Sequence, residues 1–213
     1  MLGEYTPYLR MGDILSSAHS LKGWPIRRER MKIIIPTCAK YRFLMDDMLK
    51  ALHKHWPRKP DVAVVDMGDA PADKWTDCMA DYFKGFEDKY FYLLLDDYYL
   101  TDDVDGEWLD LAEGTIHKNG YSKVDLSDDR AKFPHVNHGI WILSRQWARY
   151  RSSLQAAIWS TCYFRKMLVR GRTPWQFELL GEKTAFWDGA DIIGTTHGIV
   201  KYENIMLKGR RKE

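Results

Sequence analysis

The sequence has few cysteines and no long apolar run, and both absences exclude classes of protein. Cys38, Cys78 and Cys162 are widely spaced and form no Cys-x-x-Cys motif. An odd number of distant cysteines is typical of a protein kept in a reducing compartment, and it disfavours a zinc site. No apolar run approaches the roughly 20 residues of a transmembrane helix, and the first residues, which include Glu4, lack the apolar stretch of a secretory signal. We therefore expect a cytoplasmic protein without a transmembrane segment.

A glycine-rich phosphate loop is also missing. The residues after the first expected strand, at positions 36–41, read Pro-Thr-Cys-Ala-Lys-Tyr. They match neither the G-x-G-x-x-G pattern of dinucleotide-binding folds nor the G-x-x-x-x-G-K-[ST] pattern of P-loop enzymes. A Rossmann dehydrogenase and a P-loop enzyme are therefore both disfavoured. A nucleotide bound by this chain must have its phosphates held in another way.

The composition is that of a folded domain, but its charge is unevenly distributed. A chain of 213 residues with 45% apolar and 29% charged residues is long enough for one full hydrophobic core. Residues 1–60 carry twelve Lys/Arg and five Asp/Glu, residues 61–130 carry six and nineteen, and residues 131–213 carry fourteen and six. An acidic centre between basic flanks suits a bound cation in the middle and a polyanion around it. The alternative is solvated surface charge.

Apolar runs alternate with helical patterns in the first hundred residues. Strands are expected at 31–36, 62–65 and 90–95, with helices at 43–55 and 75–86 between them. This βαβαβ order predicts a parallel sheet with right-handed crossovers. Later patterns predict helices at 108–116, 163–169 and 174–180, and strands at 139–143, 154–159, 192–193 and 199–200. We expect one α/β domain over 31–213, with a mostly parallel central sheet flanked by helices, and an N-terminal arm or lid at 1–30.

The third expected strand ends in two adjacent carboxylates, Asp96 and Asp97. The run 90–95 before them is continuously apolar, as in a strand buried on both faces of a parallel sheet. Such a strand places its end at the sheet edge where α/β proteins bind their ligands. Two carboxylates there predict a hard cation with a phosphate on its far side. The alternative is a solvated acidic loop with a capping Asp.

Five motifs in the same order resemble those of the nucleotide-sugar glycosyltransferases of the GT-A fold, especially phage and bacterial members. They are Ile33-Ile34-Ile35-Pro36-Thr37-Cys38 followed by Lys40-Tyr41, Trp56-Pro57, Leu94-Leu95-Asp96-Asp97-Tyr98-Tyr99-Leu100, Ser153-Leu154-Gln155-Ala156-Ala157-Ile158-Trp159 and Thr173-Pro174-Trp175-Gln176-Phe177-Glu178-Leu179. The resemblance covers about residues 31–208. It implies a GT-A-like domain and a nucleotide-sugar donor, with UDP as the expected nucleotide.

The resemblance also implies a divalent cation. The acidic metal motif of the family is usually Asp-x-Asp, whereas this chain reads Asp96-Asp97-Tyr98 and lacks the third-position carboxylate. Asp97 is then the expected ligand of Mn²⁺ or Mg²⁺, with Asp96 reaching either the metal or the ribose. His197 is a candidate third ligand or phosphate contact, although a lone His is more often structural.

The family implies roles for residues near the nucleotide as well. Thr37 and Tyr41 match the place where it cradles a uridine-type nucleoside, and Asp66 matches an acid that hydrogen-bonds the base. For Tyr41 the alternative is packing on the core, and for Asp66 it is capping of a loop. Glu178 is the candidate general base, since inverting members use an Asp or Glu near a short helix to deprotonate the acceptor. The alternative for Glu178 is an ordinary surface position.

The expected reaction is the transfer of a sugar from a nucleotide sugar to an acceptor hydroxyl. The acceptor is either a glycan or a hydroxymethylated base in DNA, as in phages, whose enzymes act in the host cytoplasm. The basic flanks would suit a DNA backbone. One alternative is a sugar nucleotidyltransferase, disfavoured because residues 36–40 lack glycine. Another is a non-catalytic carbohydrate- or DNA-binding module, against which the acidic pair argues.

Overall fold

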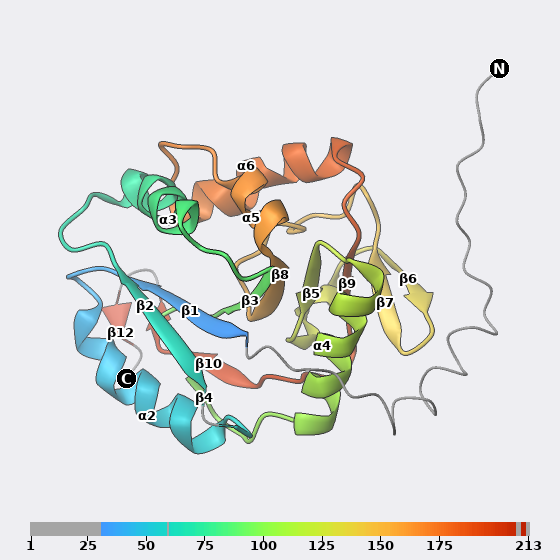
Figure 1. Ribbon diagram of the computed structural model, residues 1–213, viewed down its shortest axis with the longest axis horizontal. Helices are drawn as coiled ribbons and strands as arrows, with labels where there is room; N and C mark the ends of the chain where they lie inside the picture. The colour runs from blue at the N-terminus through green and yellow to red at the C-terminus, as the bar shows by residue number, and fades with distance from the viewer. Residues whose placement is uncertain (1–30, 59, 208–209, 212–213) are drawn as a thin grey trace.

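A mixed sheet forms the centre of the molecule (Figure 1). The computed structural model describes residues 31–58, 60–207 and 210–211, so the expected arm or lid at 1–30 lies outside the described residues. Within them the sheet has eight strands in the order β2-β1-β3-β8-β5-β9-β7-β6. Helices cover both of its faces, which confirms the expected α/β class. No described helix is long and apolar enough to cross a membrane.

The N-terminal half of the sheet is parallel, as predicted. Its strands are β2 (Asp61–Asp66), β1 (Lys32–Thr37) and β3 (Tyr90–Leu93). Strand β1 pairs in parallel with both neighbours, so that the ends of β1 and β2 lie together at Thr37 and Asp66. The crossovers are α2 (Met45–His55) and α3 (Trp75–Lys84). The βαβαβ order read from the sequence is therefore confirmed.

The C-terminal half of the sheet is largely antiparallel, which the sequence did not predict. Its strands are β8 (Ala157–Ser160), β5 (Lys123–Asp125), β9 (Ile192–Gly194), β7 (Trp141–Ser144) and β6 (His135–His138). Only β5 and β9 are parallel; β8 runs antiparallel to β3 and β5, and β7 to β9 and β6. Gly139, expected inside a strand, has φ 65° and forms the β6–β7 turn instead.

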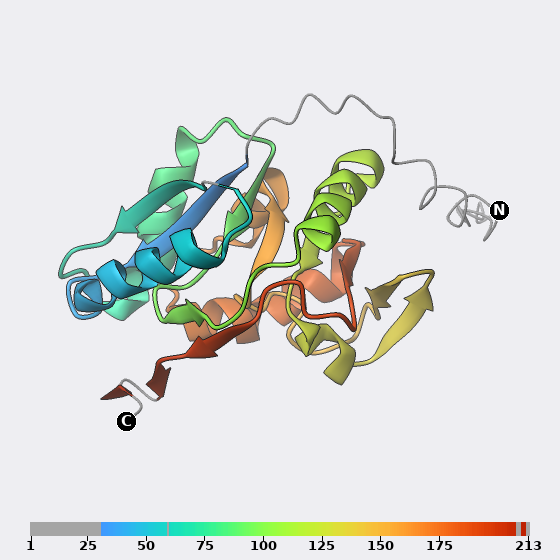
Figure 2. The same cartoon turned by 90° about the horizontal axis from the view of Figure 1, so that it is seen from below.

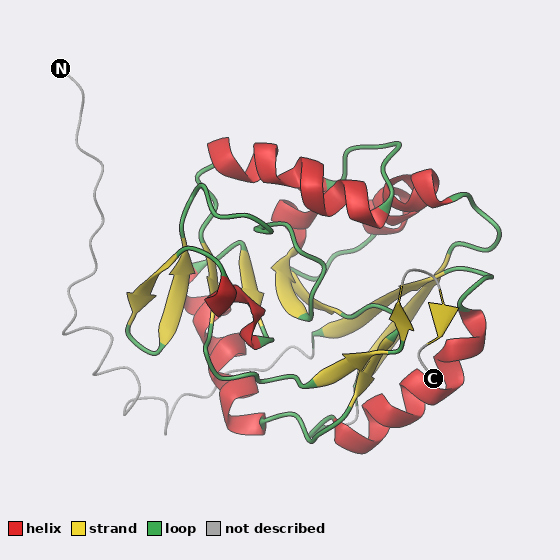
Figure 3. Ribbon diagram, turned by 180° about the vertical axis from the view of Figure 1, so that it is seen from behind, coloured by secondary structure: helices red, strands yellow, loops and turns green. Residues whose placement is uncertain are grey.

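Two apolar clusters, one on each face, hold the helices to the sheet. Ile33 and Ile35 point to the face covered by α2 and α4 (Gly106–Asn119), whereas Ile34 points to the other face. That second face carries α3, α5 (Thr161–Met167) and α6 (Pro174–Trp187), which lie together at the top of Figure 1. Figure 3 shows from behind that the helices enclose the strands. Burial on both faces explains the continuous apolar runs in the sequence.

Two departures from the sequence predictions shape the site. Helix α6 does not end before Gly181 but continues through it to Trp187. A Cβ at position 181 would lie 2.5 Å from Ser152 Oγ. This glycine allows α6 to approach the 152–155 loop closely. The expected strand at 199–200 is a loop whose amides both donate to the carbonyl of Leu126.

The C-terminal segment returns across the molecule. Strand β10 (Tyr202–Asn204) pairs antiparallel with β4 (Tyr98–Leu100), directly after the two carboxylates. Figure 2 shows this red segment beside the green β4. A last ribbon joins β11 (Met206–Leu207) to β12 (Arg210–Arg211). The rings of Tyr98 and Tyr202 stack with centroids 4.2 Å apart, which fixes the register of the β4–β10 ribbon.

Candidate functional site

A large cavity of about 650 Å³ opens at the carboxyl ends of β1 and β3. This is the sheet edge where α/β proteins bind ligands. Segments from the whole chain line the cavity: Pro36, Thr37, Cys38, Lys40 and Tyr41 after β1; Met67, Ala70, Pro71, Ala72 and Trp75 before α3; Leu95, Asp96, Asp97 and Tyr98 after β3; Leu154 and Gln155; Thr173, Pro174, Trp175 and Glu178 on α6; and Asn204 and Met206. The cavity thus brings together Thr37, Tyr41, Asp96, Asp97 and Glu178 of the sequence-predicted site.

Asp96 is the buried member of the acidic pair. Only 9% of it is exposed, and its Oδ2 accepts a hydrogen bond of 2.7 Å from the Thr37 hydroxyl on the neighbouring strand. Burial raises the pKa of Asp96 to about 6; the Thr37 hydrogen bond lowers it, and the charge of Asp97 raises it further. The two carboxylates therefore differ: Asp96 titrates close to neutral pH and is anchored to Thr37.

The C-terminal segment holds Asp97 through two hydrogen-bonding residues, Asn204 and Ile205. The carbonyl of Asp97 accepts from the amide of Ile205 at 2.9 Å. The Asn204 side chain, oriented with its NH₂ group toward Asp97, donates to the carboxylate. Asn204 reaches this place because the β10–β4 register sets it opposite Tyr98. The sequence analysis missed Asn204 and Met206, because strands as short as β10 and β11 carry no recognisable apolar period.

Tyr41 and Asp66 end up in different places. Tyr41 lines the large cavity, with Lys40 Nζ 5.1 Å from the centre of its ring. Asp66 does not line the cavity. Its carboxylate accepts from the Gly68 amide at 2.9 Å and pairs with Arg42 at 2.6 Å, and the Gly68 hydrogen bond is the main cause of its lowered pKa. Asp66 thus has the loop-capping arrangement that the sequence left open.

Glu178 lies in the first turns of α6, at a wall of the large cavity. The helix begins with a capping box in which Thr173 and Gln176 satisfy each other's backbone amides. Glu178 Oε1 accepts from the Leu154 amide at 2.6 Å, and its backbone carbonyl accepts from the Ser152 hydroxyl at 2.8 Å. Burial raises the pKa of Glu178, against the lowering effects of the Leu154 amide and of Lys123. Glu178 is therefore a half-buried, held carboxylate and not a free surface side chain.

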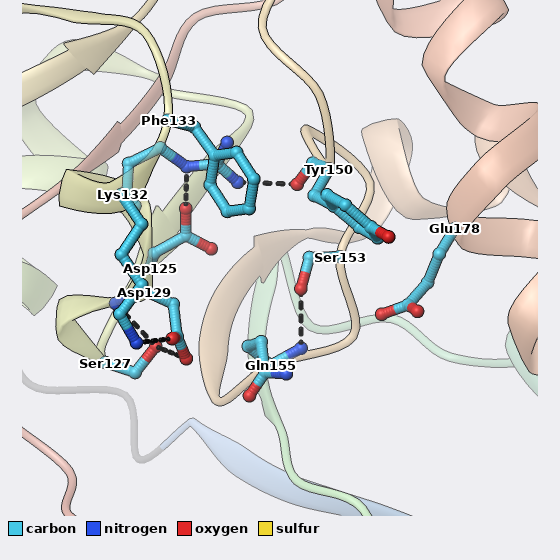
Figure 4. A pocket seen from close by; sticks show the side chains of 10 residues that line it. Asp125, Ser127, Asp129, Lys132, Phe133, Tyr150, Ser153, Gln155 and Glu178 are labelled. Carbon is cyan, nitrogen blue, oxygen red and sulfur yellow. Dashed lines mark hydrogen bonds and ion pairs between the residues drawn. The ribbon is translucent and has the colours of Figure 1, made fainter.

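A second, small cavity of about 210 Å³ lies beside Glu178 (Figure 4). Its lining residues are Asp125, Ser127, Asp129, Arg130, Lys132, Phe133, Tyr150, Ser153, Gln155 and Glu178. Glu178 and Gln155 line both cavities. Figure 4 shows Glu178 extending from its helix toward Ser153 and Gln155. The hydroxyl of Tyr202 donates to the Gln155 side chain, so both shared residues are held in place.

The small cavity was not found from the sequence. Ser153 and Gln155 lie within the motif 153–159, of which residues 154–159 were expected to form a strand, whereas β8 begins only at Ala157. Asp129, Phe133 and Tyr150 come from loops and a short 3₁₀ turn, for which no pattern indicates a common location. A pair of polar residues directly before a buried run is the only signal that the sequence offered.

His197 is separated from the two carboxylates. Its Nε2 lies 3.0 Å from Asp105 Oδ2, and its ring stacks on Trp108 with centroids 5.0 Å apart. It lines neither cavity. Among the described residues no three His, Cys, Asp or Glu side chains gather as a metal-binding group. The structure therefore does not bring His197 together with Asp96 and Asp97, because the loop that carries it is tied to the start of α4.

Comparisons with known proteins place the fold. No protein-family model matches the sequence, and no curated protein is significantly similar to it. The structure of S. aureus TarS 1–349 superposes with a TM-score of 0.53 at 12% identity, over 81% of this chain and 59% of that chain. Its complex with UDP gives a TM-score of 0.51, with the same identity and coverage. The chain therefore has an α/β fold like that of the TarS structure, with a mixed central sheet flanked by helices. It spans 59% of the length of the TarS structure, and at 12% identity the likeness shows the fold alone.

Proposed function

We propose that the protein is a glycosyltransferase that moves a sugar from a nucleotide sugar, UDP-linked in the first instance, to an acceptor hydroxyl. The observation that carries the proposal is that two cavities share one half-buried carboxylate, Glu178. Transfer of a sugar needs the donor and the acceptor to be held together, next to the group that takes the proton from the acceptor. The fold is that of enzymes that handle nucleotide sugars.

The large cavity is the proposed donor site. Its volume of about 650 Å³ is within the range of pockets that enclose a small ligand. Thr37, Tyr41 and Lys40 line it at the end of β1, where the nucleoside and a phosphate would lie. TarS, which shares the fold, has been crystallised with UDP. A bound donor would then extend from Tyr41, past the acidic pair, toward Glu178.

The fold family implies a divalent cation, and the residues fit one that the donor completes. Mg²⁺ is commonly bound by one or two carboxylates together with substrate phosphates, so a full protein cage is not required. Asp97 would hold it, with Asp96 behind it and the Asn204 NH₂ group donating to the Asp97 carboxylate. When bound, the cation would neutralise the charge of the departing diphosphate.

Glu178 is the proposed general base. Its carboxylate takes the proton from the acceptor hydroxyl while that oxygen bonds to the anomeric carbon. The bond from this carbon to the diphosphate breaks, and the nucleoside diphosphate leaves with the electron pair. A single displacement of this kind inverts the anomeric centre. The burial that raises the pKa of Glu178 makes it a stronger base than an exposed Glu.

The small cavity is the proposed acceptor site, and its lining favours a glycan. The rings of Phe133 and Tyr150 lie 5.3 Å apart at one wall, and the Ser127 hydroxyl and Asp129 carboxylate provide polar partners for sugar hydroxyls. The lining has three carboxylates, Asp125, Asp129 and Glu178, against two basic side chains, which disfavours a DNA phosphate there. We therefore place a glycan ahead of hydroxymethylated DNA as acceptor.

The test is a thermal-shift screen of nucleotide sugars with Mn²⁺, Mg²⁺ or EDTA, followed by a transfer assay on glycans and on hydroxymethyl-DNA. We expect a metal-dependent rise in melting temperature with one class of nucleotide, because a ligand that binds only the folded state stabilises it. Release of nucleoside diphosphate should then depend on an acceptor. Pyrophosphate release from a nucleoside triphosphate and a sugar phosphate would instead identify a nucleotidyltransferase. No shift with any nucleotide would overturn the proposal.

A further inference from the structure

The peptide group between Ser153 and Leu154 connects a buried lysine to Glu178. Lys123 Nζ donates to the carbonyl oxygen of Ser153 at 2.6 Å. The amide of Leu154 donates to Glu178 Oε1, also at 2.6 Å. The C=O of one residue and the N–H of the next belong to the same planar unit. The ammonium, the peptide and the carboxylate therefore form one continuous chain of hydrogen bonds.

Lys123 has no exposed surface, which is rare for a lysine. It belongs to the central strand β5, and its ammonium lies 2.7 Å from Asp125 Oδ1 and 4.6 Å from the centre of the Trp159 ring. Asp125 is shared, since Arg130 Nε binds its other oxygen at 2.7 Å. The buried cluster thus joins two basic side chains to one carboxylate, and burial lowers the pKa of Lys123 while the charge of Asp125 raises it. Buried charges persist when they are paired, so the unbalanced positive charge needs a further anion.

We infer that Lys123 is a positioning residue for Glu178: acting through the Ser153–Leu154 peptide, it holds the Glu178 carboxylate in place and in its ionised form. The ammonium polarises the peptide, and a polarised N–H is a stronger donor to a carboxylate. Glu178 is the anion that the buried cluster lacks. Its importance for sugar transfer rests on the proposed function, but the connection itself does not.

Burial and the lysine act on Glu178 in opposite directions. Burial raises the pKa of Glu178 and so favours the protonated carboxyl, which cannot accept a proton from an acceptor hydroxyl. The Leu154 amide and the positive charge of Lys123 both lower the pKa of Glu178. The Leu154 amide also fixes the direction of Glu178 Oε1. The same peptide group therefore favours the ionised form of Glu178 and orients its carboxylate.

The other charged groups around Glu178 are already engaged. Glu182, one turn later on the same helix, accepts from the Tyr150 amide at 2.9 Å. The titratable and charged groups that line the small cavity with Glu178 are Asp125, Asp129, Arg130, Lys132 and Tyr150, and those of the large cavity are Cys38, Lys40, Tyr41, Asp96, Asp97 and Tyr98. Asp129 and Lys132 form an ion pair with each other, as do Asp125 and Arg130. Lys123 is the cation that acts on Glu178.

The first test is a carboxyl-carbon NMR titration of the substrate-free protein in EDTA, with the Glu178 signal assigned from E178Q. We expect Lys123→Met, which keeps the length of the stem but removes the ammonium, to raise the midpoint of Glu178 by about one pH unit or more. The matched control is Arg151→Met, which removes another buried cation whose donors reach other carbonyls, those of Ser144, Arg145 and Ala190. An unchanged midpoint in K123M would overturn the inference.

A measurement on the wild-type protein covers the case in which K123M does not fold. The amide nitrogen of Leu154 and the Nζ of Lys123 should both change chemical shift with the same midpoint as the Glu178 carboxyl, because the three groups form one hydrogen-bond chain. A Lys123 Nζ chemical shift that does not change at the Glu178 midpoint would contradict the hydrogen-bond chain between Lys123 and Glu178.

The link to catalysis is tested separately by pH–rate profiles. If Glu178 is the base, the acidic limb of kcat/KM in K123M should move upward by the same amount as the NMR midpoint, so that activity falls more at pH 6 than at pH 9. An NMR shift in a protein without transfer activity would sustain the role of Lys123 toward Glu178 and refute the proposed function. A pH profile that stays in place while the NMR midpoint moves would refute Glu178 as the base.

Discussion

The two halves of the sheet are built on different principles. The N-terminal half, β1 to β3, is parallel, and its buried residues are almost all apolar. The C-terminal half contains short, largely antiparallel strands and buries the charged side chains of Lys123, Asp125, Arg130 and Arg151. In the N-terminal half, apolar packing of parallel strands is enough to form the sheet edge that lines the proposed donor site. Holding the irregular 150–155 loop against Glu178 takes ions that donate to backbone carbonyls.

The largest expected effect of a single change is at the junction of the two cavities. Glu178→Gln should lower kcat by roughly 10²–10⁴-fold and leave donor affinity nearly unchanged, because a general base acts mainly in the transition state. Steady-state kinetics and calorimetry with the donor measure the two quantities. Glu182→Gln is the matched control, since Glu182 also accepts an amide from this loop but lines neither cavity. Similar losses of kcat in both variants would show that Glu178 has no role that Glu182 lacks.

The acidic pair tests the N-terminal half. Asp97→Asn should abolish the metal-dependent part of donor binding while leaving the melting temperature of the free protein close to that of the wild type. Calorimetry with UDP and Mn²⁺, repeated in EDTA, gives the comparison. Asp66→Asn changes a carboxylate at the end of the adjacent strand β2 that does not line the cavity, and it should bind normally. Full binding by D97N would show that the phosphates are held elsewhere.

The raised pKa of Asp96 predicts that the free energy of unfolding falls as the pH rises through the pKa of this carboxyl. It keeps its proton up to about pH 6 when folded, whereas an ordinary Asp has a pKa of 3.8. Its contribution to stability is therefore full below pH 3.8 and is lost as the pH rises through 6. Asp96→Asn cannot ionise and can still accept from Thr37. In EDTA at pH 8 it should exceed the wild type in free energy of unfolding by at most about 3 kcal/mol, with no gain at pH 3.5. Equal pH dependence in urea titrations would contradict the burial of this charge.

The contact between α6 and the loop can be disturbed sterically. Gly181→Ala places a Cβ against Ser152 and should cost about 1–3 kcal/mol of stability. It should also lower kcat, because the same loop carries the amide that holds Glu178. Gly85→Ala is the control, since a Cβ there meets nothing within 4 Å. Thermal unfolding of both variants would show whether the close approach matters.

The smallest effect is expected at His197. His197→Ala removes a half-exposed hydrogen bond to Asp105 and should cost less than about 1 kcal/mol. Donor affinity in the presence of Mn²⁺ should not change. A clear loss of metal-dependent binding would restore His197 to the site.

The difference between the halves also explains what the sequence revealed. The alternation of Ile33, Ile34 and Ile35 between two apolar clusters produces a run that any buried strand would show, so β1, β3 and the acidic pair were found. Lys123 and Asp125 interrupt β5, and a three-residue strand with two charges carries no strand pattern. Asn204 reaches the site through pairing with a strand about a hundred residues away. Such long-range pairings leave no local signal.

The most direct test of the account is a crystal structure of the protein with a UDP-sugar and Mn²⁺. We predict the nucleotide in the large cavity, its diphosphate beside Asp97 and Asn204, and its sugar next to Gln155 and Glu178 at the opening to the small cavity. A nucleotide bound in the small cavity, or a sugar directed away from Glu178, would contradict the claim that the two cavities hold donor and acceptor on either side of one base.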